Sequence, residues 1–172
     1  ATAPSRALLV NNAAVAGPVG SLGTFDAAEL AASLAVNLIA PAALANAFCA
    51  AFADAGVERR IVNVSSGAHQ GGRIDFDALQ SERRYEPIRV YSMTKLANLL
   101  FTYELARRLD GTGVTVNAVH PGVVATKLLA SYLDVPVVGG TIARSFGARP
   151  EKGAETIIHL ASAPAVGGIS GD

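Results

Sequence analysis

The chain has 172 residues, of which 51% are apolar, and its 14 basic and 14 acidic side chains leave no formal net charge. That length is enough for one domain with a hydrophobic core, and a neutral surface excludes the strong electrostatic footprint of a nucleic-acid or anionic-membrane partner. The single cysteine, Cys49, excludes an intramolecular disulfide framework and a cysteine-cluster metal site, so we expect a reducing, cytoplasmic setting.

One uncharged segment, residues 30–53, is long enough to span a lipid bilayer. It consists mostly of alanine, and it contains the polar residues Ser33, Asn37 and Asn46, which oppose insertion into hydrocarbon. We therefore expect a helix of a soluble protein, buried on most of its circumference, and no membrane association.

Short apolar runs alternate with helical segments along the chain. Buried strands are predicted over residues 7–11, 61–64 and 114–119. Helices are predicted over residues 26–55, 89–109 and 149–162. Asp26 and Glu29 form a capping box for the first helix, and Pro41 is expected to bend it.

The remaining stretches carry the signals of turns and loops. Residues 17–20 are expected to form a turn, and residues 67–89, rich in glycine and then in charge, a surface excursion. Residues 127–149 are irregular and apolar, and we expect residues 128–138 to form an apolar lid.

The alternation of apolar strands and helices indicates an α/β fold with a parallel sheet covered on both faces, in a single domain over residues 1–172. Ligands of such sheets bind outside the carboxyl ends of the strands. Polar residues follow each predicted strand, at 11–12, 65–66 and 120–126. We therefore expect the functional site at this edge.

Tyr91 and Lys95 are four residues apart in a helical pattern, so their side chains share one face. A phenol with a pKa of about 10 is a poor acid near neutrality, but a neighbouring ammonium favours the phenolate and lowers that pKa. Tyr91 would then serve as a proton donor and acceptor. Alone, the same spacing also fits a half-buried tyrosine beside a solvated lysine.

Two further polar residues fit the same chemistry. Ser66 ends the second strand, where its hydroxyl would polarise a substrate carbonyl beside the acid. By itself, Ser66 also fits a plain turn residue. Asn37 lies within the uncharged helix, either bonded to a backbone carbonyl at the Pro41 bend or anchoring a water that relays protons from Lys95.

The chain resembles the classical short-chain dehydrogenase/reductase family at six places in the family's order. They are residues 9–14 (LVNNAA), 36–38 (VNL), 61–66 (IVNVSS), 91–95 (YSMTK), 121–126 (PGVVAT), and 153–154 with 168–171. The resemblance implies a partial Rossmann-like, doubly wound parallel sheet in which the family's first three strands and last strand are missing.

The resemblance also implies roles for individual residues. Tyr91 would be the general acid of carbonyl reduction, with Lys95, Ser66 and Asn37 completing a catalytic tetrad, and Lys95 would also hold the nicotinamide ribose. The residues that the resemblance assigns to cofactor binding are Asn12, Ala13, Ala14, Tyr91, Lys95, Pro121, Val124 and Thr126. The reaction implied is NAD(P)-dependent interconversion of an alcohol and a ketone or aldehyde.

Within the family, the segments 65–69 (SSGAH), 95–98 (KLAN) and 119–122 (VHPG) are similar to the retinol-dehydrogenase-like branch. That branch implies a lipophilic carbonyl or alcohol substrate and favours NADP over NAD. The family also implies a homo-oligomer formed through helices 26–55 and 89–109. His69 and His120 lack metal-ligand spacing, so we expect turn histidines and no metal site.

Two departures from the family's pattern stand out. Ala14 replaces a glycine, at an expected cost of ~1 kcal/mol if the backbone there needs glycine. The glycine-rich phosphate loop that opens family members does not precede Ala7. We therefore expect the chain to be a piece of a longer enzyme. The alternative is a truncated, non-catalytic fragment that acts as a dimerisation module.

A third interpretation is a sugar-nucleotide epimerase of the extended branch, which shares the Tyr-x-x-x-Lys pattern. Residues 11–14 and 121–126 follow the classical pattern instead and disfavour it.

Overall fold

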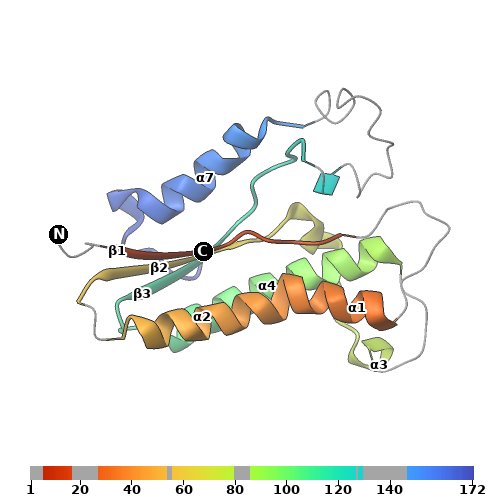
Figure 1. The fold of residues 1–172 in the computed structure, drawn as a ribbon, viewed down its shortest axis with the longest axis horizontal. Helices are drawn as coiled ribbons and strands as arrows, with labels where there is room; N and C mark the ends of the chain where they lie inside the picture. Colours follow the sequence, from red (N-terminus) through yellow and green to blue (C-terminus); the bar gives the residue numbers. More distant parts are fainter. Residues whose placement is uncertain (1–5, 17–26, 54–55, 80–85, 127, 130–146) are drawn as a thin grey trace.

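The fold is a three-stranded parallel sheet between two helical layers (Figure 1). The computed structural model describes residues 6–16, 27–53, 56–79, 86–126, 128–129 and 147–172. The strands lie in the order β1 (Arg6–Asn11), β2 (Glu58–Val64) and β3 (Val114–Val119). Helices α1, α2 and α4 cover one face of this sheet and α7 covers the other. The predicted α/β class and parallel sheet are confirmed.

The strands pair in register because each presents apolar residues to both helical layers. Leu9, Ile61 and Val116 lie side by side across the sheet. Ile61 packs with α2 and α4, whereas Val62, one residue on, packs with α7. β2 is buried from Arg60 to its end because it is the central strand.

The first helical segment is a run of three elements, α1 (Ala27–Leu34), a π-helical turn η1 (Ala35–Ile39) and α2 (Ala40–Ala51). The irregularity therefore precedes Pro41, where we expected the bend. Because Pro41 has no N–H, it cannot donate to the Asn37 carbonyl four residues earlier. Asn98 Nδ2 donates to that carbonyl instead, at 3.3 Å.

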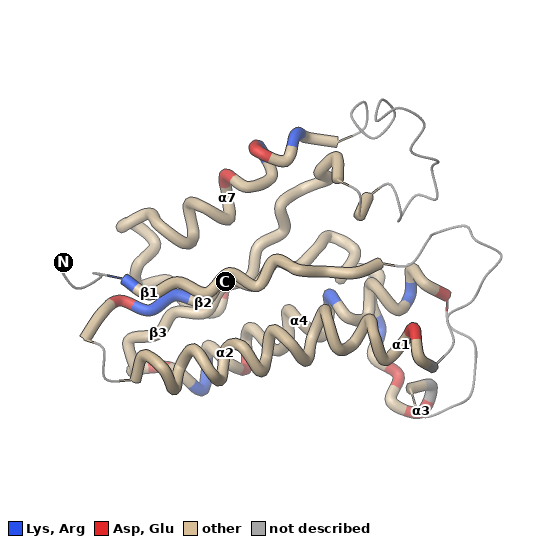
Figure 2. The backbone as a smooth tube through the Cα atoms, in the orientation of Figure 1, with Lys and Arg blue, Asp and Glu red and all other residues tan. Residues whose placement is uncertain are grey.

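The prediction that this segment is buried on most of its circumference is wrong. Its buried residues form one stripe that faces the sheet and α4, namely Leu30, Ser33, Asn37, Pro41, Ala45 and Phe48. Ile39 and Leu44, between these positions, are exposed. Glu29 is the only charged residue of α1 and α2, and these two helices are almost without charge in Figure 2.

The same segment, Ala28–Ala51, is long and apolar enough to cross a membrane, with a mean hydropathy of 1.7. A helix in the core of a soluble protein meets the same criterion, so length and composition alone do not distinguish a core helix from a membrane-spanning helix.

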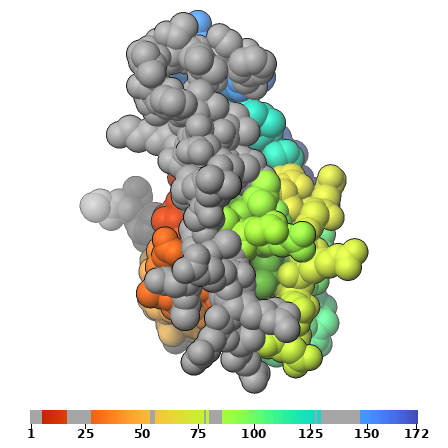
Figure 3. Space-filling view, turned by 90° about the vertical axis from the view of Figure 1, so that its right-hand side faces the viewer, coloured from red at the N-terminus to blue at the C-terminus, as the bar shows by residue number. Residues whose placement is uncertain are grey.

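The second predicted helix, residues 89–109, matches α4 to within two residues at each end. A short 3-10 turn, η2 (Gly67–Gly71), and a one-turn helix, α3 (Phe76–Leu79), precede α4 (Pro87–Arg108). Pro87 lies in the first turn of α4, where its missing N–H costs nothing. Figure 3 shows α4 (green) between α1 (orange) and residues 67–79 (yellow) at the end of the molecule where the strands finish.

The last helix, α7 (Pro150–Ser162), matches its predicted range, and a 3-10 turn, η3 (Pro164–Val166), follows it. The chain then runs beside β3, because Gly171 N donates to Val116 O and Ala118 N donates to Asp172 O. The expected capping residue Asp26, the turn at 17–20 and most of the expected lid at 128–138 lie outside the described residues.

Strand β2 begins three residues earlier than its apolar run predicts, because a charged cluster is part of the strand. Arg60 is only 2% exposed, and its Nη1 donates to the carbonyls of Leu160 and Ala163 at the end of α7. Glu58 pairs with both Arg60 and Arg6. The guanidinium groups thereby satisfy carbonyls that a helix terminus leaves without partners.

Replacing Arg60 with methionine should lower the free energy of unfolding by about 3 kcal/mol, because two helix-end carbonyls and the Glu58 carboxylate lose a buried donor. Urea unfolding followed by circular dichroism measures this loss. The matched control is Arg89→Met, at a residue whose side chain is 81% exposed in its ion pair, which should cost no more than about 0.5 kcal/mol. Equal losses in the two variants would contradict this account.

Candidate active site

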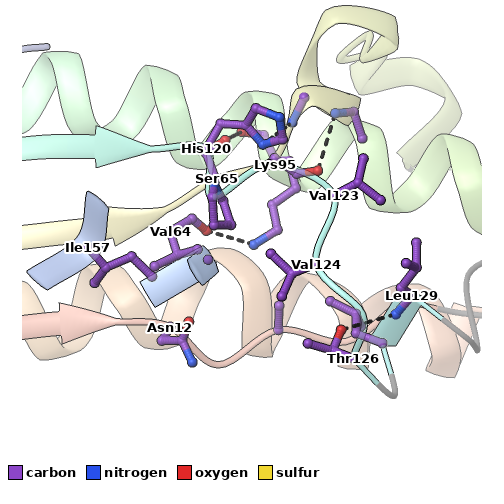
Figure 4. Close-up of a pocket in the computed structure, with 18 of the residues that line it drawn as sticks. Asn12, Val64, Ser65, Lys95, His120, Val123, Val124, Thr126, Leu129 and Ile157 are labelled. Carbon is purple, nitrogen blue, oxygen red and sulfur yellow. Dashed lines mark hydrogen bonds between the residues drawn. The ribbon is translucent and has the colours of Figure 1, made fainter. Parts of the chain in front are cut away.

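A pocket of about 910 Å³ opens at the carboxyl ends of the three strands, between α4 and α7. Its wall residues come from segments far apart in the sequence (Figure 4). The predicted site residues that line it are Asn12, Ala13, Ala14, Ser66, Tyr91, Lys95, Pro121, Val124 and Thr126. One cavity at the predicted edge of the sheet therefore gathers all of these residues, and their functional roles stay predictions.

Tyr91 and Lys95 lie on the buried face of α4, 8% and 2% exposed. The Lys95 Nζ atom is 5.7 Å from the centroid of the Tyr91 ring, and the four-residue spacing therefore brings the cation to the phenol as predicted. Nζ also donates to the carbonyl of Val64 at the end of β2, at 2.8 Å (Figure 4). Lys95 is thereby fixed to the end of β2 in the lining of the pocket.

Burial lowers the pKa of Lys95 from 10.5 to about 8. The ammonium therefore stays mostly protonated at neutral pH, although the chain takes most of its hydration away. One N–H bond is made with Val64 O. Because an ammonium has three donors, Lys95 can donate further bonds to oxygen atoms of a molecule in the pocket.

The depressed pKa of Lys95 predicts how stability depends on pH. Between about pH 8 and 10.5 the unfolded chain holds more protons at this lysine than the folded chain, so stability rises with pH across that window. Relative to Lys95→Met, the wild-type protein should gain about 2 kcal/mol between about pH 7.5 and about pH 9.5. Urea unfolding of both proteins at the two pH values measures it, and a constant difference would contradict the buried charge.

The two serines that follow β2 have different environments. Ser65 Oγ donates to the backbone carbonyl of Lys95 at 3.1 Å and is buried, so it joins β2 to α4. Ser66 is half-buried, and its Oγ accepts the N–H of Ala68 at 3.3 Å. Because this oxygen acts as an acceptor in that bond, its own O–H can point into the pocket. Ser66 thus lies where the carbonyl-polarising serine is expected, while also capping a turn.

Asn37 does not line the pocket. Its Oδ1 accepts from Val15 N and its Nδ2 donates to Val15 O, both at 2.8 Å. Nδ2 also donates to Thr94 Oγ1 at 3.0 Å, on the turn of α4 between Tyr91 and Lys95. The alternative of a bond to a backbone carbonyl at the Pro41 bend is therefore wrong, and the water relay stays a prediction.

Asn11 belongs to the core rather than to the pocket edge where we expected it. Its Nδ2 donates to Asn63 Oδ1, and Asn63 Nδ2 donates to Thr102 Oγ1. Thr102 donates in turn to the carbonyl of Asn98. All four residues are buried, so this chain of hydrogen bonds fixes β1 and β2 against α4.

The segment after β3 forms the wall opposite Asn12. Val124 makes an isolated bridge with Ala148, in which Ala125 N donates to Ala148 O. A Cβ atom on Gly153 would lie 2.5 Å from a Val124 methyl carbon, so α7 can approach this wall only at a glycine. Thr126 Oγ1 accepts the N–H of Leu129 (Figure 4).

Several lining residues were not among the predicted site residues. They are mostly apolar: Val10, Val64, Val123, Leu128, Leu129, Ala154 and Ile157. Hydrophobicity gives no signal that separates such residues from core residues. His120 also lines the pocket, within the strand-end residues 120–126 that were expected to border the site, although it was assigned no role beyond that of a turn histidine.

The site and fold agree with a family match. The sequence model described as "short chain dehydrogenase" matches residues 7–134. The chain belongs to the short-chain dehydrogenase family.

The similar sequences include human retinol dehydrogenase 14, 48% identical over 116 residues that cover 65% of this chain and 34% of that protein. Human retinol dehydrogenase 12 is 46% identical over 112 residues, covering 65% of this chain and 35% of the relative. The predicted likeness to the retinol-dehydrogenase-like branch is confirmed. The alignments thus span about a third of the length of these relatives.

Solved structures show the same fold. A 3-ketoacyl-(acyl-carrier-protein) reductase from Brucella melitensis complexed with NADH has a TM-score of 0.71 at 23% identity, covering 95% of this chain and 62% of that one. A 4-hydroxyisoleucine dehydrogenase complexed with NADH has a TM-score of 0.67 at 22% identity, covering 98% and 65%. The expected partial Rossmann-like fold is therefore confirmed.

Proposed function

We propose that this protein is part of an NAD(P)-dependent oxidoreductase that interconverts an alcohol and a ketone or aldehyde. The observation that carries the proposal is the buried Tyr91–Lys95 pair, which shares one pocket with Ser66. An acid, a cation and a second hydroxyl around one cavity fit a reaction in which a carbonyl oxygen gains or loses a proton.

In the reductive direction, the Tyr91 hydroxyl donates its proton to the substrate oxygen. Ser66 O–H donates a hydrogen bond to the same oxygen and orients it. The Lys95 ammonium, 5.7 Å from the centre of the tyrosine ring, stabilises the phenolate that remains. In the oxidative direction the same phenolate accepts the alcohol proton.

The residues present fit the nicotinamide half of a dinucleotide cofactor. The buried Lys95 ammonium has donors suited to ribose hydroxyls. Asn12, Ala13 and Ala14 line one wall of the pocket and Pro121, Val124 and Thr126 another. The cofactor supplies or accepts the hydride when bound. The family resemblance of the sequence favours NADP, whereas the two solved structures with the same fold are complexed with NADH.

Asn37 takes part as a positioning residue. Its amide holds the backbone of Val15, after the Asn12–Ala14 wall, and the hydroxyl of Thr94, beside Lys95. A water bound near Asn37 would complete the tetrad that the family resemblance implies.

The substrate that suits this pocket is a small lipophilic carbonyl or alcohol compound. Apolar side chains of the segment after β3 and of α7 surround the polar centre, including Val123, Leu129 and Ile157 (Figure 4). The similarity to proteins named retinol dehydrogenases supports a lipophilic substrate.

A cytoplasmic location, with the helices α1 and α2 packed in a protein core rather than in a bilayer, is part of the same proposal. The buried stripe of α1 and α2 contains Ser33 and Asn37, which fit a protein core better than a bilayer. Cys49 is half-buried, and burial raises the pKa of its thiol, which suits a cysteine kept reduced.

Tyr91→Phe should reduce kcat at least ~1,000-fold in the full-length enzyme assayed with NADPH and an aliphatic or retinoid aldehyde, because the variant has no proton to donate. Fluorescence titration with NADPH should give an unchanged Kd, since the phenyl ring keeps the packing. Substantial remaining turnover would contradict Tyr91 as the acid. Tyr103→Phe, on the exposed face of α4, is the control and should leave kcat unchanged.

The outer faces of α2 and α4 are proposed to form a homo-oligomer. Leu44 on α2 and Leu100 on α4 are 52% and 49% exposed, on two neighbouring helices with little charge between them. The double variant Leu44→Glu/Leu100→Glu should convert a dimer into a monomer by light scattering. Ile158→Glu, equally exposed on α7, should not. A monomeric wild-type protein would contradict the proposal.

A further inference from the structure

Two histidines that the proposed reaction does not use meet at one peptide bond. His69 lies in η2 and His120 follows β3, 51 residues later in the sequence. Both imidazoles contact the peptide unit that joins Ser66 to Gly67. This peptide directly follows the serine that faces the pocket.

His69 contacts the carbonyl side of that peptide. Its Nδ1 lies 2.6 Å from the Ser66 carbonyl oxygen. A carbonyl oxygen only accepts, so Nδ1 of His69 must carry the proton. The backbone N–H of His69 donates to the same oxygen at 3.0 Å, and the carbonyl is therefore held from two directions.

His120 contacts the amide side. The N–H of Gly67 donates to Nδ1 of His120 at 3.0 Å. Nδ1 of His120 must therefore be unprotonated, and a neutral ring carries its proton on Nε2. The two histidines must therefore be opposite tautomers, and this difference between them can be observed by spectroscopy.

The contact with His120 leaves little room for a side chain at position 67. A Cβ atom at position 67 would lie 3.1 Å from His120 Nε2 and 3.3 Å from Cε1, so the ring lies against the Gly67 backbone. Ser66 itself is extended, with φ −157° and ψ 150°, and its Oγ accepts the N–H of Ala68. The plane of the Ser66–Gly67 peptide therefore sets where the Ser66 side chain points.

We infer that His69 and His120 form a clamp on the Ser66–Gly67 peptide and act as positioning residues for the Ser66 hydroxyl. The inference rests on the proposed function for the role of Ser66, but the clamp itself is a property of the fold. Both bonds come from side chains of different elements, η2 and the end of β3. The clamp therefore links the turn after β2 to the neighbouring strand's end at the pocket.

The tautomers test the clamp without any assay of activity. Two-bond ¹⁵N–¹H correlation spectra, recorded at a pH where both imidazoles are neutral, distinguish an Nδ1 proton from an Nε2 proton. His69 should carry its proton on Nδ1 and His120 on Nε2, with signals assigned from single-histidine variants. A proton on Nε2 of His69, or on Nδ1 of His120, would overturn the clamp.

Kinetic measurements test whether the clamp positions the Ser66 hydroxyl. Asparagine places an amide atom where a histidine has Nδ1, so His120→Asn keeps an acceptor and His69→Asn keeps a donor, whereas leucine keeps neither. His120→Leu and His69→Leu should each lower kcat roughly tenfold, less than the ~100-fold of a full 1 Å misplacement. The asparagine variants should recover most of the loss, and Kd for NADPH should not change in any of them.

The control is His159→Leu, at an exposed position on α7, which should keep wild-type kcat. If the two leucine variants also keep wild-type kcat while Tyr91→Phe is inactive, the clamp has no positioning role although the proposed function stands. If the full-length wild-type enzyme shows no turnover at all, the proposed function fails, and the tautomers still decide whether the clamp exists.

Discussion

The rest of the site depends on the interactions of the buried Lys95 ammonium. Its bond to the Val64 carbonyl ties the middle of α4 to the end of the central strand, and it brings a cation to the Tyr91 ring. The same burial that lowers the pKa of Lys95 to about 8 makes the ammonium available for new oxygen partners. A surface lysine donates all of its hydrogen bonds to water, so it would gain less from bonds to a ligand. The stability lost by burying this charge is thus exchanged for a pre-organised binding group.

Much of the fold could be predicted from the sequence, because strands buried on both sides have short apolar runs and α7 has a clear start. The predictions failed where local pattern and tertiary packing disagree. Arg60 reads as a surface residue, but the end of α7 supplies carbonyl partners that allow its burial in β2. Pro41 signals an irregular helix, but the Asn37 carbonyl to which it cannot donate accepts from Asn98, 61 residues later in the sequence. The exposed face of α2 was hard to distinguish from its buried face because, apart from Asn46, both consist of apolar residues.

The lining of the pocket was predicted more completely, since strand-end position indicates Ser66 and the four-residue helical spacing indicates Tyr91 and Lys95. Asn37 was identified without its partners, because the hydrogen bonds of an amide depend on which backbone segment folds against it. His120 was undervalued for a similar reason. A histidine after a strand has no periodic signature, and its contact with Gly67 crosses 53 residues of sequence.

The contact between Gly153 and Val124 makes the volumes of two positions interdependent. The glycine lets the backbone of α7 rest on a valine methyl that is also part of the pocket wall. A relative with a smaller residue at 124 would have a void there, and alanine at 153 would fill it. A change in the volume of the residue at 124 therefore requires a compensating change at 153. Among relatives, substitutions in the pocket wall at 124 should be accompanied by substitutions on the inner face of α7 at 153.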